Sequence, residues 1–240
     1  MMNKLFFLLV AIAAVNFSCR YTHGKRVSGN GHISNEQRNV TGFTGVETHG
    51  AIDIVASQGD YSVKVEADQN LLQYIETNMQ DGRLIVRFKE GISLYNAGNA
   101  KVVVSAPELN ALETHGSGNI SSQGKLTNKN KMNIYISGSG DIQLEADCPD
   151  IRTETHGSGN ITLQGNTKTL SCKTSGSGDI KAADLKAESV TVSIHGSGDN
   201  EVFASESLDI EIFGSGDVHY RGQPKISTAV HGSGAVSKMN

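Results

Sequence analysis

The chain has 240 residues, enough for one or two domains with a sizeable core, and 37% of them are apolar. Its 21 basic residues stand against 25 acidic ones, a net charge of −4, which excludes the strongly basic surface typical of nucleic-acid binding. The 27 Gly residues come with only 3 Pro, so the composition is neither collagen-like nor typical of disorder.

The chain begins with a segment typical of a secretory signal. Lys4 supplies a positive charge, and the apolar run 5–15 that follows is too short to cross a bilayer core. Ser18 and Cys19 come next, an arrangement that resembles a bacterial lipoprotein signal, and the looseness of the motif resembles that of Bacteroidetes lipoproteins. This resemblance implies a signal peptide over 1–18 and a lipid on Cys19, most simply in the outer membrane, with the side of that membrane left open. An ordinary cleaved signal is the alternative.

The segment 19–37 is rich in Gly, Ser and Asn and has no apolar periodicity, so we predict a flexible tether. One domain is expected over 38–240, with irregular coils and a cap over 38–112 and regular repeats over 113–240. In the irregular part, the patterns predict strands over 51–55, 61–66, 83–89 and 101–105. They also predict a short helix that begins at Asp68 and carries Leu71, Leu72, Ile75 and Met79 on one face.

The tripeptide Gly-Ser-Gly recurs seven times, at spacings of 22, 19, 19, 20, 18 and 18 residues, and the segment 48–52 is a degenerate earlier copy. We interpret its glycines as structural corners: Gly116, Gly118, Gly138, Gly140, Gly157, Gly159, Gly176, Gly178, Gly196, Gly198, Gly214, Gly216, Gly232 and Gly234.

The residues on either side of each corner alternate between apolar and polar. Two, four and six positions before the corner the residues are mostly aliphatic or Thr, and four positions after its first Gly stand Ile120, Ile142, Ile161, Ile180, Asn200, Val218 and Val236. Period-2 alternation predicts strands with one buried face. A unit of about 19 residues cannot close its own core, so equivalent strands must stack in parallel about 4.8 Å apart, as in a β-solenoid.

Both ends of such a stack need cover. We expect the helix and its neighbouring hairpin to cap the amino end. The last copy runs out near residue 240, which leaves an exposed rung as a candidate surface for self-association or for a partner strand.

Several short motifs precede the repeats, in order: Phe43-x-x-Val46, Asp53-Ile54, Gln58-Gly59, Val63-x-Val65, Asn70-Leu71, Ile75-x-Thr77, Gly82-x-Leu84 and Ala106-Pro107-x-Leu109. Together with the repeats, they resemble the putative auto-transporter adhesin, head GIN domain family, over about residues 40–236. The resemblance implies an all-β, right-handed parallel β-helix related to pectin-lyase-like folds, with a small α/β cap at its amino end. It also implies an adhesion role without an identified catalytic site.

Two columns of polar residues invite a metal interpretation. His115, His156, His195 and His231 each precede a corner, as His49 precedes its degenerate copy, but neighbouring histidines should lie two rungs apart, too far to share a zinc ion. Asp179, Asp199 and Asp217 follow successive corners and are weak candidates for Ca²⁺. We expect instead that these Asx side chains bind backbone amides and that the histidines are surface residues.

No motif indicates catalysis or a cofactor. The sequence has no Gly-x-Ser-x-Gly elbow, no P-loop and no Gly-x-Gly-x-x-Gly. Of the remaining cysteines, Cys172 falls at an inward position out of register with Cys148, which favours a buried free thiol over a disulfide. The leading hypothesis is a non-catalytic, lipid-anchored envelope protein with an unknown protein or glycan partner. The alternatives are a polysaccharide-degrading enzyme and a glycan-binding module.

Overall fold

A computed structural model describes residues 25–95 and 98–239 of the chain. The elements, in order, are β1 (Lys25–Ser28), β2 (Ile33–Arg38), β3 (Gly45–Gly50), β4 (Ile52–Gln58), β5 (Ser62–Asp68), the 3-10 turn η2 (Leu72–Tyr74), β6 (Ile75–Gln80), β7 (Arg83–Phe88), β8 (Ile92–Tyr95), β9 (Ala100–Ala106), β10 (Ala111–Gly116), β11 (Ile120–Thr127), β12 (Lys131–Gly138), β13 (Ile142–Asp147), β14 (Asp150–Gly157), β15 (Ile161–Gly176), β16 (Ile180–Gly196), β17 (Asn200–Gly214), β18 (Val218–Gly222), β19 (Lys225–Val230) and β20 (Val236–Lys238).

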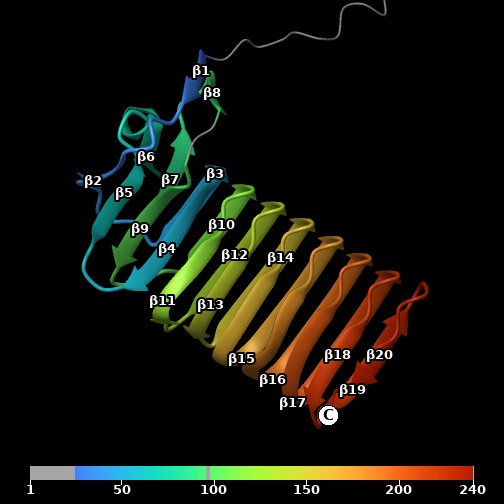
Figure 1. Ribbon diagram of the computed structural model, residues 1–240. Helices are drawn as coiled ribbons and strands as arrows, with labels where there is room; N and C mark the ends of the chain where they lie inside the picture. The colour runs from blue at the N-terminus through green and yellow to red at the C-terminus, as the bar shows by residue number, and fades with distance from the viewer. Residues whose placement is uncertain (1–24, 96–97, 240) are drawn as a thin grey trace, which may run out of the picture.

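The repeats form a parallel β-solenoid, as predicted (Figure 1). Each rung has one strand that leads to a Gly-Ser-Gly corner and one that follows it. The first kind stack into what we call the approach face, made of β3, β10, β12, β14, the second halves of β15, β16 and β17, and β19. The second kind stack into the return face, made of β4, β11, β13, the first halves of β15, β16 and β17, β18 and β20.

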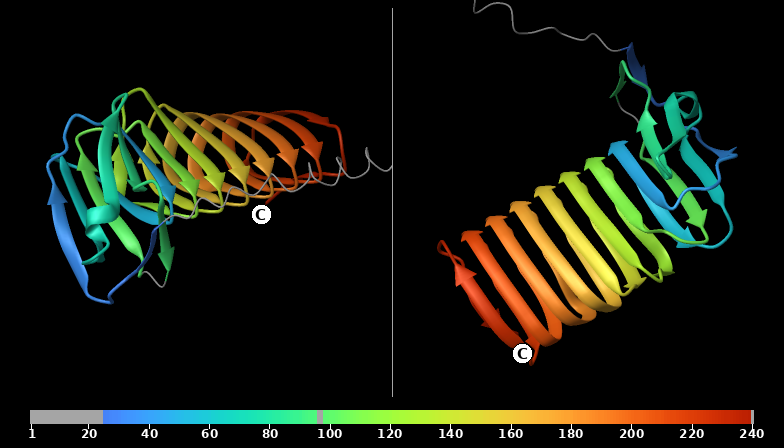
Figure 2. Two further views of the ribbon diagram at one scale, coloured as in Figure 1. Left: turned by 90° about the horizontal axis from the view of Figure 1, so that it is seen from above. Right: turned by 180° about the vertical axis from the view of Figure 1, so that it is seen from behind.

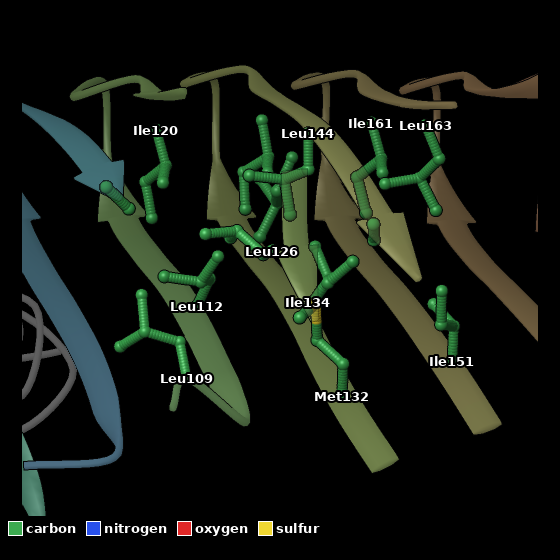
Figure 3. Close-up of a cluster of buried hydrophobic side chains, with 14 of the residues drawn as sticks. Leu109, Leu112, Ile120, Leu126, Met132, Ile134, Leu144, Ile151, Ile161 and Leu163 are labelled. Carbon is green, nitrogen blue, oxygen red and sulfur yellow. The ribbon is translucent and has the colours of Figure 1, made fainter. Parts of the chain in front are cut away.

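Like residues lie over one another inside the stack. Ile142 pairs with Ile161 and Ile161 with Ile180, and all three are fully buried. Leu144 pairs in register with Leu163, and Figure 3 shows both side chains, with that of Ile161, in the buried interior. Fully burying an aliphatic side chain stabilises a fold by about 1.5–3 kcal/mol, so these columns supply most of the driving force for stacking.

The corners require glycine for a steric reason. The N–H groups of Ser158 and Gly159 both donate to the carbonyl oxygen of Gly138, at 2.9 and 3.2 Å, which draws one corner down onto the one before it. A Cβ on Gly157 or Gly159 would fall on the backbone of the preceding corner, and Gly157 also has a φ of +126°. These close contacts leave no room for a side chain at the corner glycines.

The amino end is closed by strands, and the predicted helix is wrong. Among the described residues of this end only η2 is helical, and the residues from Ile75 onward form β6, which pairs antiparallel with β7. The reason is the turn between them: Asp81 and Gly82 both have positive φ, 49° and 76°, the geometry of a tight hairpin with two central residues. Asp68 does not cap a helix either, because its carboxylate accepts from the N–H groups of Gly31 and Gly98.

The cap strands extend both faces of the solenoid (Figure 2). On the approach face β7 pairs in parallel with β3, and on the return face β9 pairs in parallel with β4 and antiparallel with β5. The four strands predicted in this region correspond to β4, β5, β7 and β9 with shifts at their ends.

The flexible tether is wrong for the residues from Lys25 onward. β1 pairs in parallel with β8, and β2 pairs antiparallel with β5 through all of its six residues. The segment has no apolar periodicity because both faces of β2 are largely exposed, so backbone pairing and two side-chain hydrogen bonds, from Gln37 to Ser62 and from Arg38 to the carbonyl oxygen of Leu72, hold it in the cap.

The carboxyl end of the stack is open. β19 pairs with β17, and β20 pairs with β18. No described strand pairs with the other edge of β19 or of β20. Ile226 and Val230 occupy inward columns but are 43% and 42% exposed.

Candidate functional site

The Asx column binds the backbone of the next rung. Oδ1 of Asp141 accepts from the N–H of Asn160 at 2.8 Å, and Oδ1 of Asn160 accepts from the N–H of Asp179 at 3.0 Å. The same bond recurs along the stack, from the N–H of Asn119 on Asp53 to the N–H of Ala235 on Asp217. One oxygen of Asp179, Asp199 and Asp217 is thereby committed to an amide, which is the structural role expected of this column. Cation binding there stays untested.

The histidine column lies on the outer surface of the approach face, and one assumption about it is wrong. His49 and His115 lie on adjacent rungs, because β10 pairs directly with β3 although the two histidines are 66 positions apart in the sequence. Their rings stack with centroids 4.9 Å apart and planes 14° apart. The separation of two rungs that argued against a shared ion does not apply to this pair.

Aromatic rings continue the stack along the approach face. The ring of Tyr135 lies 5.3 Å from that of His115 and 5.6 Å from that of His156. A second run joins Phe213 to His195 and His231, each 4.8 Å away. The rings form two stripes along the solenoid axis, close to the corners.

A charged cluster lies beside the first stripe. Arg83 on β7 extends across β3 and donates to Oε2 of Glu113 on β10 at 2.8 Å and to Oε2 of Glu47 at 3.4 Å. Gly45 and Ala111 make this crossing possible, because a Cβ on Gly45 would lie only 3.1 Å from both the Arg83 side chain and the Ala111 methyl group. The cap strand β7 thereby places the positive charge of Arg83 beside the second rung of the stack.

A groove of about 570 Å³ on the approach face is lined by Arg83 and Glu113 of the cluster and by His115 and Tyr135 of the first stripe. Its walls include Arg83, Glu113, His115, Tyr135, Arg152, Glu154 and Lys173, drawn from β7, β10, β12, β14 and β15. We call this the approach-face groove. It combines aromatic surface with charges of both signs and opens to solvent, which suits it for binding an extended polar partner.

One carboxylate of the groove is stabilised in its charged form. Oε1 of Glu154 accepts from Nζ of Lys173 at 2.7 Å and lies 2.7 Å from Nε2 of His156. The hydrogen bond from Lys173, more than any other contact, lowers the pKa of Glu154 below its usual 4.5. Glu154 is therefore an ion-pair partner and not a proton donor near neutral pH.

Cys148 and Cys172 are both buried free thiols, as expected for Cys172. Cys172 lies between Thr153 and Val192 in an inward column, and desolvation raises its pKa to about 12. A thiol held in this neutral form is a poor nucleophile, so it packs as a core residue.

Sequence reasoning missed the approach-face groove, although a signal was present. The tetrapeptide Glu-Thr-His-Gly occurs three times, at 47–50, 113–116 and 154–157, and each copy places a Glu and a His on the outer surface. The sequence did not indicate that the first two copies lie in direct register, or that the side chain of Arg83 reaches both.

Fold and surface together define a class: an all-β parallel solenoid, capped at its amino end, with an exposed groove on one face. Residues 42–224 match the family described as putative auto-transporter adhesin, head GIN domain, and the chain belongs to that family. The expectation from the sequence motifs is confirmed.

Solved structures share this fold. A putative adhesin from Bacteroides fragilis is 23% identical, with a TM-score of 0.82 over 89% of this chain and 100% of its own. A putative lipid binding protein from Parabacteroides distasonis is 29% identical, with a TM-score of 0.74 over 90% and 100%, and a putative adhesin from the same species is 26% identical, with 0.71 over 89% and 100%. No curated protein matches the chain.

Cys19 and the segment 1–18 lie outside the described residues. Within the part of the chain that the structure covers, no helix has the length and apolar character needed to span a membrane.

Proposed function

We propose that the protein is a non-catalytic adhesin of the cell envelope, anchored by a lipid on Cys19 and most simply placed in the outer membrane. Its binding surface is the approach-face groove, which contacts a protein or another component of a cell surface. The family to which the chain belongs supports the adhesive role. The observation that carries the assignment of the surface is the combination of Tyr135 with Arg83, Arg152 and Lys173 in one open groove.

The charges of the approach-face groove support binding over catalysis. Glu113 is paired with Arg83, and Glu154 with Lys173 and His156. Glycoside hydrolysis needs one carboxylic acid with a raised pKa, whereas the pKa of Glu154 is lowered. A polysaccharide-degrading role, the enzymatic alternative, therefore has weak support at this site.

Glycan binding without turnover is the second candidate. The stripe of Tyr135 between His115 and His156 offers ring faces and edges beside hydrogen-bonding groups, a mixture that suits sugars as well as peptides. Retention of the purified protein on a glycan array, lost in Tyr135→Ala, would favour this candidate over a protein partner.

The open carboxyl-terminal rung is the second contact surface of the proposal, and its occupant is a second copy of this chain. The amino end is closed by β2, β5 and β6, so head-to-tail stacking would meet a covered edge. Pairing between two β19 edges joins like with like and buries Ile226 and Val230 of both copies. Sedimentation should show a dimer that Ile226→Glu with Val230→Glu converts to monomer; a wild-type monomer at all concentrations contradicts this contact.

Attachment of whole cells tests the adhesive role. A deletion strain should attach less well than its parent to the surface that the bacterium colonises, and the wild-type gene should restore attachment. Cys19→Ala should abolish incorporation of labelled palmitate and release the protein from the membrane fraction. Equal attachment of the deletion strain and the parent would contradict the adhesive role, and unchanged labelling of Cys19→Ala would contradict the anchor.

A further inference from the structure

The register of β3 on β10 brings two Glu-x-His pairs together on the outer surface. Glu47 lies directly beside Glu113, and His49 directly beside His115. One ligand atom from each of Glu47, Glu113 and His115 lies within 4.8 Å of the others. Nε2 of His49 lies 2.7 Å from Oε1 of Glu47, so His49 borders this cluster of three side chains.

The charges at this point do not balance. The Glu47 and Glu113 side chains are only 17% and 12% exposed, and both carboxylates depend on one guanidinium, that of Arg83. With neutral histidines the four side chains and Arg83 carry one net negative charge. A half-buried negative charge of this kind favours a bound cation.

The two oxygens of Glu47 point to different partners. Oε2 faces Arg83 at 3.4 Å, whereas Oε1 faces Nε2 of His49 at 2.7 Å and Nε2 of His115 at 3.6 Å. Arg83 can therefore keep its hydrogen bond to Oε2 while Oε1 and the two imidazole nitrogens meet a metal ion. An outer partner that holds a ligating carboxylate in this way is a common feature of metal sites.

We propose that Glu47, His49, Glu113 and His115 bind a divalent transition-metal ion of the zinc class. Two imidazoles and two carboxylates make a tetrahedral nitrogen and oxygen donor set that suits zinc, with metal–ligand distances of about 2.0–2.2 Å. Closing the ligand atoms onto one ion requires the side chains to turn toward one another, which their partial exposure at a strand surface allows. The ion would fasten the capped first rung to the second and fix one end of the approach-face groove.

The chain contains a matched control. Glu154 and His156 form the same Glu-x-His pair at 2.7 Å, but their neighbours in register are Lys173 and Ser175 on one side and Tyr135 and Ser137 on the other. This pair has no second histidine or carboxylate on an adjacent rung. It should not hold an ion by itself.

Metal titration of the purified mature protein tests the proposal, with Zn²⁺ by calorimetry and Co²⁺ by visible absorption as probes. The wild type and His156→Asn should bind one ion with equal affinity, with the absorption of tetrahedral Co²⁺. His49→Asn and His115→Asn should each weaken binding by about tenfold or more. Circular dichroism establishes that the variants remain folded, since both histidines are outward. No binding by the wild type, or equal affinity in His49→Asn and His115→Asn, would overturn the site.

Discussion

Oδ1 of Asp179 accepts a hydrogen bond from the main-chain N–H of Asp199, one rung further along the solenoid, at 3.0 Å. Because the same bond recurs from rung to rung, the Asx column acts as a backbone clamp along one edge. Asp179→Ala should lower the free energy of unfolding by about 0.5–1.5 kcal/mol, whereas Asp179→Asn, which keeps the acceptor, should stay close to the wild type. Urea unfolding measures both, and equal losses in the two variants would contradict this role.

The second glycine of each corner is required because a side chain there would collide with the preceding corner. An ordinary turn glycine is required because of its positive φ. A Cβ on Gly159 would overlap the carbonyl oxygen of Gly140, whereas one on Gly124, where φ is +82°, would meet open space. Gly124→Ala should cost only about 1–2 kcal/mol of backbone strain. Gly159→Ala should cost clearly more, because two corners must move apart. Thermal unfolding separates the two, and similar melting temperatures would contradict the steric argument.

Much of this fold could be predicted from the sequence because the same pattern of inward and outward residues recurs in every rung of a solenoid. Each inward position recurs at every rung, so the repeat alone places Ile142, Ile161 and Ile180 in one column. The amino end does not repeat, and there a spacing of apolar residues that fits one face of a helix belonged instead to η2 and β6. The hairpin between β6 and β7 is fixed by the positive φ of Asp81 and Gly82, a local preference that outweighed the helical pattern.

The approach-face groove was less accessible to sequence reasoning. It depends on contacts between segments far apart in the chain, such as Arg83 with Glu113 and His49 with His115. The repeated Glu-Thr-His-Gly motif could be recognised in the sequence. The direct pairing of its copies at 47–50 and 113–116, which are far apart in the chain, could not be predicted. β2 was missed for a related reason, since its pairing with β5 uses the backbone and leaves little pattern in its side chains.

A charge placed in an inward column should unfold the central rungs. Val192 is 1% exposed and lies between Cys172 and Ile210, so the carboxylate of Val192→Asp would have no polar partner in that column. The expected cost is several kcal/mol. The matched control is Ser193→Asp, one residue away on the outer surface between Lys173 and Glu211, which should leave stability nearly unchanged. Full thermal stability of Val192→Asp would contradict the column.

The thiol of Cys172 should make stability depend on pH in the alkaline range. Its pKa is about 12 in the folded chain against an ordinary value of 9.0, so the folded state holds the proton more tightly than the unfolded state. The resulting stabilisation is complete below pH 9.0 and is lost as the pH rises toward about 12. The wild type should therefore lose stability relative to Cys172→Val, by up to about 1.4 kcal/mol per pH unit. Urea unfolding of both proteins at rising pH measures this, and parallel curves would contradict the burial of an ionisable thiol.

Competition for attachment tests the central claim, that binding occurs at the approach-face groove, most directly. Purified protein that lacks the lipid is added to wild-type cells, and their attachment is counted. The wild-type protein and a return-face control, Gln143→Ala with Gln164→Ala, should inhibit attachment equally, whereas Tyr135→Ala with Arg152→Ala should inhibit poorly. Equal inhibition by all three proteins would show that adhesion uses another surface and would contradict the assignment.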